Sequence, residues 1–169
     1  MTEQCNSTSL PCRYSMAFPL AILLIAVLSY ANSFFGVFLY DDSRMLKHVS
    51  EAATSSSAVW SMLMSSSRPV ADLTFLGNYL VGGVRAADYH LVNLAIHVLA
   101  ALLLFGIVKR TLLLPLFSEH LRHRAEWIGF FCAAIWVCHP LTTSCITYIV
   151  QRYEALMGMF FLLTLYCVI

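Results

Sequence analysis

Long apolar runs are the feature that most constrains the fold of this chain. Residues 16–39 are mostly apolar, and ~20 apolar residues are enough to cross the ~30 Å hydrocarbon core of a bilayer. Further runs cover residues 91–108, 127–137 and 155–169. The chain is 60% hydrophobic and 11% charged, whereas soluble domains are ~45–50% apolar. These runs predict an all-α, polytopic membrane helical bundle of about four spans.

Basic residues set the expected orientation. Lys109, Arg110, Arg122 and Arg124 lie between the second and third apolar runs, and basic loops stay on the cytoplasmic side. The N-terminus is then cytoplasmic as well. The expected segments are a cytoplasmic tail (1–15), span 1 (16–40), an outer periplasmic or lumenal loop (41–88), span 2 (89–108), a basic cytoplasmic loop (109–126), span 3 (127–148), a short outer loop (149–153) and span 4 (154–169).

The outer loop is expected to carry one or two interfacial helices and not a separate folded domain. Residues 43–50 and 58–64 have helical composition, and serine triplets punctuate them as turns or caps. Span 4 reaches Ile169 without flanking charges, so we expect it to be cut short. The predicted location is an integral, multi-pass site in a bacterial inner membrane, or in the endoplasmic reticulum of a eukaryote.

Tyr40-Asp41-Asp42 follows span 1 directly, which places two carboxylates at the membrane surface. Adjacent acids are costly to half-bury there. One interpretation is an end-of-helix marker that keeps Tyr40 at the interface. The other is a catalytic or ligand-binding acid pair that faces a membrane-embedded cavity.

A polar stripe marks span 2, because His90, Asn93 and His97 are spaced to share one helix face. Such residues either hydrogen-bond to neighbouring helices or line a cavity in the bundle. The two histidines lie two turns apart, ~10 Å along the axis, too far for one metal ion unless another segment intervenes. We therefore predict no metal site.

Span 3 ends at His139-Pro140. Proline removes a backbone donor and kinks or ends a helix, and the carbonyls it frees need side chains or water as partners. Arg152 follows, at the expected outer surface. It is either an interfacial arginine paired with Glu154 or a guanidinium that holds a lipid phosphate through two hydrogen bonds.

Several short motifs occur together in a characteristic order. They are Tyr40-Asp41-Asp42, Arg68-Pro69-Val70, Tyr89-His90-Leu91-Val92-Asn93-Leu94, His139-Pro140-Leu141 and Thr147-Tyr148-Ile149-Val150-Gln151-Arg152. From about Tyr40 onward, the chain resembles the N-terminal membrane region of the transmembrane and tetratricopeptide-repeat O-mannosyltransferase-like family, as a bacterial-type relative. That family is similar to the type C glycosyltransferases. One departure is Ser144, where the family often has Glu or Gln.

The resemblance implies a truncated type C glycosyltransferase fold, with further spans and a tetratricopeptide-repeat domain beyond this chain. It implies transfer of a sugar from a polyprenyl-phosphate donor to a protein or glycan hydroxyl on the outer membrane face. Asp41 or Asp42 would be the catalytic base, with a slight preference for Asp42. The resemblance assigns substrate and lipid-phosphate binding to Arg152, Gln151, His139, His90, Asn93 and Arg68.

No cofactor is required by these motifs, although a divalent cation on the carboxylates stays open. The expected partners are membrane lipid, the lipid-linked sugar donor and the acceptor, and the absence of a basic tract argues against nucleic acid. This chain alone is expected to be inactive. Two alternatives stay open: a non-catalytic membrane scaffold or subunit, and an ion- or solute-transporting protein that uses Asp41, Asp42 and His90.

Overall fold

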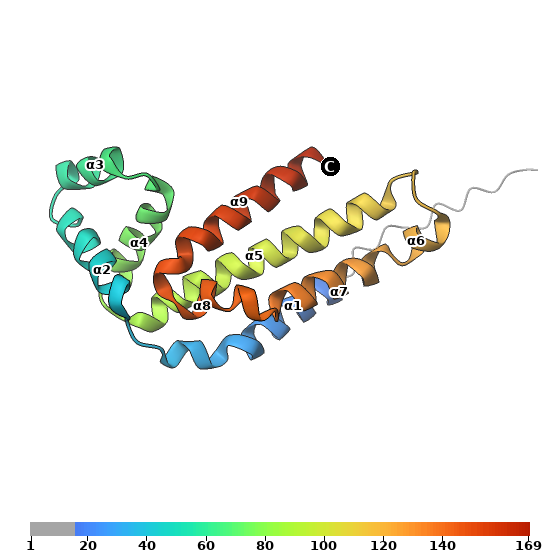
Figure 1. Cartoon of the computed structure of the whole chain (residues 1–169), viewed down its shortest axis with the longest axis horizontal. Helices are drawn as coiled ribbons and strands as arrows, with labels where there is room; N and C mark the ends of the chain where they lie inside the picture. Colours follow the sequence, from blue (N-terminus) through green and yellow to red (C-terminus); the bar gives the residue numbers. More distant parts are fainter. Residues whose placement is uncertain (1–15) are drawn as a thin grey trace, which may run out of the picture.

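The computed structural model describes residues 16–169, and every regular element in that range is a helix (Figure 1). The cytoplasmic tail expected over residues 1–15 lies outside the described part. The elements are α1 (Ala17–Tyr30), η1 (Ala31–Phe35), α2 (Tyr40–Ala52), α3 (Ser56–Ser65), α4 (Pro69–Gly82), α5 (Ala86–Leu113), α6 (Glu119–His123), α7 (Ala125–Val137), η2 (Pro140–Thr142), α8 (Ser144–Thr147), η3 (Ile149–Gln151) and α9 (Arg152–Val168).

An elongated bundle of α1, α5, α7 and α9 makes up most of the molecule, and α2–α4 form a lobe at one end (Figure 1). The central helix is α5, which packs against α1, α7 and α9. Ala101 of α5 and Ala133 of α7 are fully buried, because small side chains allow membrane helices to approach closely. The fold is therefore an all-α membrane helical bundle, as predicted.

Helices long and apolar enough to cross a membrane are Ala17–Phe35, with 19 residues, and Ala86–Leu113, with 28 residues. A third candidate is α7 together with Pro140–Thr147, which meet at a bend of 57°. Helix α9, with 17 residues, covers the run expected to form span 4. The chain is thus a membrane protein, and the expectation of about four spans with a cytoplasmic N-terminus stays a prediction.

The break after α7 follows from Pro140, and the polar stripe of α5 holds the broken segment. Each of the three stripe residues binds a backbone carbonyl in or beside the break, where carbonyls freed from a regular helix need side-chain partners. The stripe therefore hydrogen-bonds to a neighbouring segment. The bonds join His90 Nδ1 to the Ile146 oxygen (2.9 Å), Asn93 Nδ2 to the Ile149 oxygen (3.2 Å) and His97 Nε2 to the Val137 oxygen (3.3 Å).

The segment expected to be the outer loop contains three helices, α2, α3 and α4, where the composition suggested one or two. Their starts follow ordinary rules: Ser55 caps α3 by accepting from the Ala58 N–H at 3.2 Å, and Pro69 occupies the first turn of α4. The three helices share an apolar core, which includes Val49 and Phe75 and extends to Tyr89 of α5. This shared core makes α2–α4 a packed lobe joined to the bundle.

Candidate functional site

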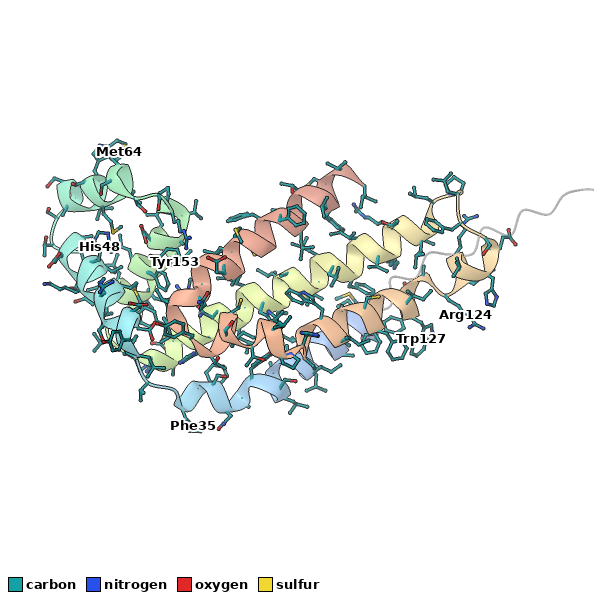
Figure 2. All side chains as sticks on the ribbon, viewed as in Figure 1. Phe35, His48, Met64, Arg124, Trp127 and Tyr153 are labelled. Carbon is teal, nitrogen blue, oxygen red and sulfur yellow. The ribbon has the colours of Figure 1, made fainter. Side chains whose placement is uncertain are left out.

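A cavity of about 470 Å³ lies where α2 meets η3 and the start of α9. This volume is within the ~300–1,000 Å³ of small-molecule sites. Figure 2 labels two of its residues, His48 within the lobe and Tyr153 near the start of α9. We call it the Asp41 cavity, and its lining residues are Asp41, Arg44, Met45, His48, Val150 and Tyr153.

Three polar residues of the Asp41 cavity share one face of α2. Asp41, Arg44 and His48 are separated by three and four residues, the spacing that brings side chains together on a helix. The Arg44 guanidinium lies 3.8 Å from Asp41 Oδ1, and the two side chains are 86% and 52% exposed. The Tyr148 hydroxyl donates to Asp41 Oδ2 at 3.4 Å. Because so exposed an ion pair adds little stability, both groups are available to a ligand.

Asp42 has a different environment, since its side chain is only 1% exposed. Its Oδ2 accepts from the Leu39 N–H at 2.8 Å, and its Oδ1 accepts from the Val150 N–H at 2.9 Å. The carboxylate caps α2 and ties this helix to η3. Only one of the two adjacent acids therefore faces the cavity, and it is Asp41, although the sequence argument slightly preferred Asp42 as the base.

Arg152 is fully buried against other helices, whereas both sequence interpretations left its guanidinium accessible. Its guanidinium donates to Asn93 Oδ1 at 2.6 Å, to Asn78 Oδ1 at 2.7 Å and to the Tyr89 carbonyl at 3.0 Å. The Phe75 ring lies 4.2 Å from its Cζ. The start of α9 packs directly against α4 and α5, so these helices occupy the donors that a lipid phosphate would need.

The remaining predicted binding residues are distributed around the fold. His139 is exposed, and its Nδ1 accepts from the Leu141 N–H at 3.2 Å, which caps η2. Arg68 lies 3.5 Å from Glu154 in a separate apolar groove between α4 and α9. Gln151 is partly buried in η3. His90 and Asn93 are buried against the broken segment. The structure thus brings none of these residues to the lining of the Asp41 cavity.

Tyr153 is a cavity residue that the sequence argument missed. Its hydroxyl donates to Oδ1 of the buried Asp72 at 2.7 Å. Burial raises the pKa of the Tyr153 phenol, and the hydrogen bond and negative charge of Asp72 raise it further. The phenol therefore keeps its proton and links α9 to α4 beside the cavity.

Arg44, His48 and Tyr148 were also missed. The sequence holds a signal for two of them. The expected helix began at Ser43, whereas α2 begins at Tyr40. In a helix that includes Asp41, the spacing places Arg44 and His48 on the same face as Asp41. Tyr148 is 107 residues from Asp41. No local pattern could have paired these two residues, because their contact depends on how η3 packs against α2.

The side chains around Asp41 are poorly suited as ligands for a resident metal ion. Within residues 16–169, no group of three or more His, Cys, Asp or Glu side chains is placed to hold a metal ion. The Asp41 carboxylate contacts a guanidinium and a phenol, and a guanidinium has no lone pair to offer a cation. The site does not fit a divalent cation held by these residues.

Comparison with known proteins identifies relatives over most of the chain. The chain is 31% identical over 153 residues to protein O-mannosyl-transferase TMTC2 of Homo sapiens, which covers 83% of this chain and 17% of that protein. It is 30% identical over 167 residues to protein O-mannosyl-transferase TMTC4 of Homo sapiens, which covers 85% of this chain and 22% of that protein. This chain is related to the TMTC O-mannosyl-transferase family. The expected resemblance is thereby confirmed.

TMTC2 of Mus musculus is a further relative, 29% identical over 153 residues. No family model matches the chain, and no solved structure matches it. The chain spans 17–22% of the length of these TMTC relatives. The O-mannosyl-transferase activity in these names is that of the whole proteins, and this chain matches only about a fifth of each.

Proposed function

We propose that this chain is part of a TMTC-type membrane glycosyltransferase and that the Asp41 cavity holds its reacting groups. The observation that carries the proposal is the placement of Asp41, an exposed carboxylate in a cavity with a cation beside it. The relation to proteins named O-mannosyl-transferases supports a sugar as the transferred group. Asp42, in contrast, is committed to two backbone N–H groups.

In this proposal, Asp41 acts as the general base, which requires hydrogen-bond reach to the proton it accepts. Its carboxylate takes the proton of an acceptor hydroxyl while that oxygen bonds to the anomeric carbon of the donor sugar. The bond from the anomeric carbon to the polyprenyl-phosphate oxygen breaks, and the electron pair leaves with the phosphate. Arg44 stabilises the charge on the departing phosphate. Arg44 thus takes the role that the sequence argument gave to Arg152.

The orientation of the chain supports an outer-face reaction. The lobe that carries Asp41 and the basic region around α6 lie at opposite ends of α5 (Figure 1). Basic segments such as the one with Arg122 and Arg124 stay cytoplasmic. The Asp41 cavity would then face the periplasm or the lumen, and the N-terminus would lie in the cytoplasm.

The test measures sugar transfer in membranes from the source organism, which contain the native protein. Labelled mannose on polyprenyl phosphate is supplied with a protein acceptor, and transfer is compared between wild type and Asp41→Asn. Loss of a general base costs ~10²–10⁴-fold in rate, so we expect Asp41→Asn to lose at least about a hundredfold. The control is Glu51→Gln, because Glu51 is a 65% exposed carboxylate on the same helix, outside the Asp41 cavity.

Each outcome separates the proposal from its alternatives. Transfer that survives in Asp41→Asn would contradict the assignment of the base. Wild-type membranes that transfer no sugar but show uptake sensitive to Asp41→Asn would favour an ion or solute transporter. Wild-type membranes that show neither sugar transfer nor uptake would leave a scaffold role.

A further inference from the structure

The apolar groove between the start of α4 and the first turns of α9 has a volume of about 280 Å³. These two helices are in contact where the lobe meets the bundle (Figure 1). The groove shares only Tyr153 with the Asp41 cavity. We call it the Arg68 groove, and its lining includes Arg68, Val70, Tyr153, Glu154, Met157 and Phe160.

One cation and one anion face each other across the Arg68 groove. Arg68 directly precedes α4, and Glu154 lies in the first turn of α9. Arg68 Nη1 is 3.5 Å from Glu154 Oε1, and the two side chains are 55% and 44% exposed. An ion pair this exposed adds little stability. Each charge is therefore available to a ligand that brings the opposite charge.

The rest of the groove is an apolar wall that leads away from these charges. Tyr153, Met157 and Phe160 are spaced by four and three residues, so they share one face of α9. Tyr153 and Phe160 lie about two turns apart, ~10 Å along the axis. Val70 faces this wall from α4. Because α9 covers the apolar run expected to form span 4, the wall extends from the charged end into the bilayer.

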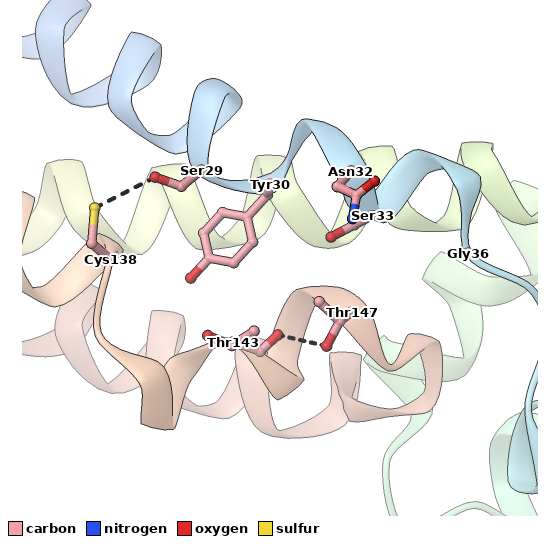
Figure 3. Close-up of a pocket in the computed structure, with 8 residues that line it drawn as sticks. All are labelled: Ser29, Tyr30, Asn32, Ser33, Gly36, Cys138, Thr143 and Thr147. Carbon is pink, nitrogen blue, oxygen red and sulfur yellow. Dashed lines mark hydrogen bonds between the residues drawn. The ribbon is translucent and has the colours of Figure 1, made fainter.

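The other cavities lack this combination of charges and apolar wall. Figure 3 shows a cavity of about 420 Å³ between the end of the first candidate span and the break in the third, and none of the described residues that line it is charged. The Asp41 cavity holds charges of both signs, but Asp41 and Arg44 both come from α2. Within residues 16–169, α2 is not among the candidate spans.

We infer that the Arg68 groove binds a zwitterionic phospholipid whose headgroup carries a primary ammonium. The phosphate accepts hydrogen bonds from the Arg68 guanidinium, for which phosphate is a favoured partner. The ammonium donates to the Glu154 carboxylate, and one acyl chain lies along Met157 and Phe160. The inference goes beyond the proposed function, since this lipid is not a reactant and its binding needs no turnover.

The charges of the groove discriminate between phospholipid classes. Glu154 disfavours a headgroup of net negative charge, because like charges brought together in an interface are costly. A quaternary ammonium has no N–H to donate to Glu154 and binds best over open aromatic faces. The Tyr153 face is already covered, since Arg68 Cζ lies 5.1 Å from its ring centroid. A primary ammonium has three N–H donors and matches the carboxylate.

Photolabelling of the full-length native protein in phosphatidylcholine nanodiscs tests the inference. The probes are trace amounts of phosphatidylethanolamine, phosphatidylcholine and phosphatidylglycerol that carry the same diazirine on one acyl chain, and mass spectrometry maps the labelled residues. We expect the ethanolamine probe to label the α9 segment with Met157 and Phe160 about tenfold more than the others, the effect of one hydrogen bond to a charged group.

Two results of the photolabelling would overturn the inference. One is equal labelling of α9 by the three probes, which would mean that lipids contact this helix without selection. The other is labelling by the ethanolamine probe that concentrates outside the Arg68 groove, for example at Thr143 and Thr147 in the cavity of Figure 3.

Variants of Glu154 test the choice of headgroup. In Glu154→Gln, the acceptor for the ammonium loses its charge, and the excess labelling by the ethanolamine probe should fall several-fold. In Glu154→Lys, two cations face the groove, so the phosphatidylglycerol probe should become the preferred one. Glu51→Gln is the control, because Glu51 is an exposed acid in an ion pair with Lys47 on the lobe. A preference for phosphatidylethanolamine that persists in Glu154→Lys would overturn the inference.

A matched pair on α4 tests the place of the acyl chain. Val70 and Leu80 are 51% and 66% exposed, but only Val70 lines the groove. Val70→Trp fills the groove and should lower labelling several-fold, whereas Leu80→Trp should label as wild type does. Equal labelling of these two variants contradicts the inference. Asp41→Asn should also label as wild type does, which separates a failure of the lipid site from a failure of the proposed base.

Discussion

The carboxylate of Asp42 accepts a hydrogen bond at 2.9 Å from the backbone N–H of Val150, 108 residues further along the chain. The same carboxylate caps α2 through the Leu39 N–H. This contact fixes the start of α2 against η3. Because neighbouring side chains on a helix diverge by about 100°, it also turns Asp41 toward the cavity. Of the two adjacent acids, Asp42 therefore ties α2 to η3, and Asp41 lines the Asp41 cavity.

The first prediction concerns the contribution of the Asp42 carboxylate to stability. In Asp42→Asn, only one side-chain oxygen remains as an acceptor, so either the Leu39 or the Val150 N–H loses its partner. We expect a loss of roughly 1.5–3 kcal/mol in unfolding free energy, the range for hydrogen bonds to charged groups. Thermal or chemical unfolding in nanodiscs measures it. Asp41→Asn is the control and should change stability by less than about 0.5 kcal/mol; equal losses in the two variants would refute the bridging role.

A second prediction compares arginine-to-lysine changes at a buried and an exposed position. Arg152 donates in several directions to Asn93, Asn78 and Tyr89, a pattern that needs the planar guanidinium and that an ammonium cannot reproduce. Arg152→Lys should cost about 2 kcal/mol or more. Arg44→Lys, at a side chain that is 86% exposed, should stay within about 0.5 kcal/mol. Equal shifts of the unfolding midpoint in Arg152→Lys and Arg44→Lys would mean that Arg152 does not hold the start of α9 against α4 and α5.

The third prediction is an energetic coupling between Asn93 and Arg152. Their side chains meet at 2.6 Å in a fully buried position, and contacting residues in one network couple by ~0.5–3 kcal/mol. A double-mutant cycle with Asn93→Ala and Arg152→Met should give a coupling of about 1–2 kcal/mol. Pairing Asn93→Ala with Arg122→Ala, near the opposite end of α5, should be additive. Additivity in both cycles would argue against the network.

The fourth prediction is a pH dependence that arises from Tyr153. Burial, together with the hydrogen bond to Asp72, raises the pKa of this phenol above its ordinary value of about 10. The folded state therefore binds the Tyr153 proton more tightly than the unfolded state does. Its contribution to stability is complete below about pH 10 and is lost as the pH rises above that value.

Unfolding temperatures measured between pH 8 and about 11 test this dependence. The stability difference between wild type and Tyr153→Phe should shrink as the pH rises through the upper part of this range. Tyr79→Phe is a control tyrosine on α4. A difference for Tyr153→Phe that stays constant with pH would show that the phenol titrates alike in the folded and unfolded states.

Particular residues show how far sequence reasoning reaches. The apolar runs predicted the bundle, and Pro140 predicted the break in the third candidate span, because both are consequences of local composition. The spacing of His90, Asn93 and His97 predicted a shared polar face. None of these patterns could show that each side chain binds a carbonyl of the broken segment, since those partners come from another part of the chain.

Local composition and spacing were enough to predict apolar helices with polar residues at defined turns, and the motifs indicated the family to which the chain is related. The contacts of the charged residues, in contrast, follow from tertiary packing. Whether Asp41, Asp42 or Arg152 meets a ligand depends on which donors and acceptors surround it, and packing between distant helices supplies these. Arg152 is buried because α4 and α5 bring Asn78 and Asn93 to it, whereas Asp41 stays exposed because Asp42 takes the backbone contact beside it.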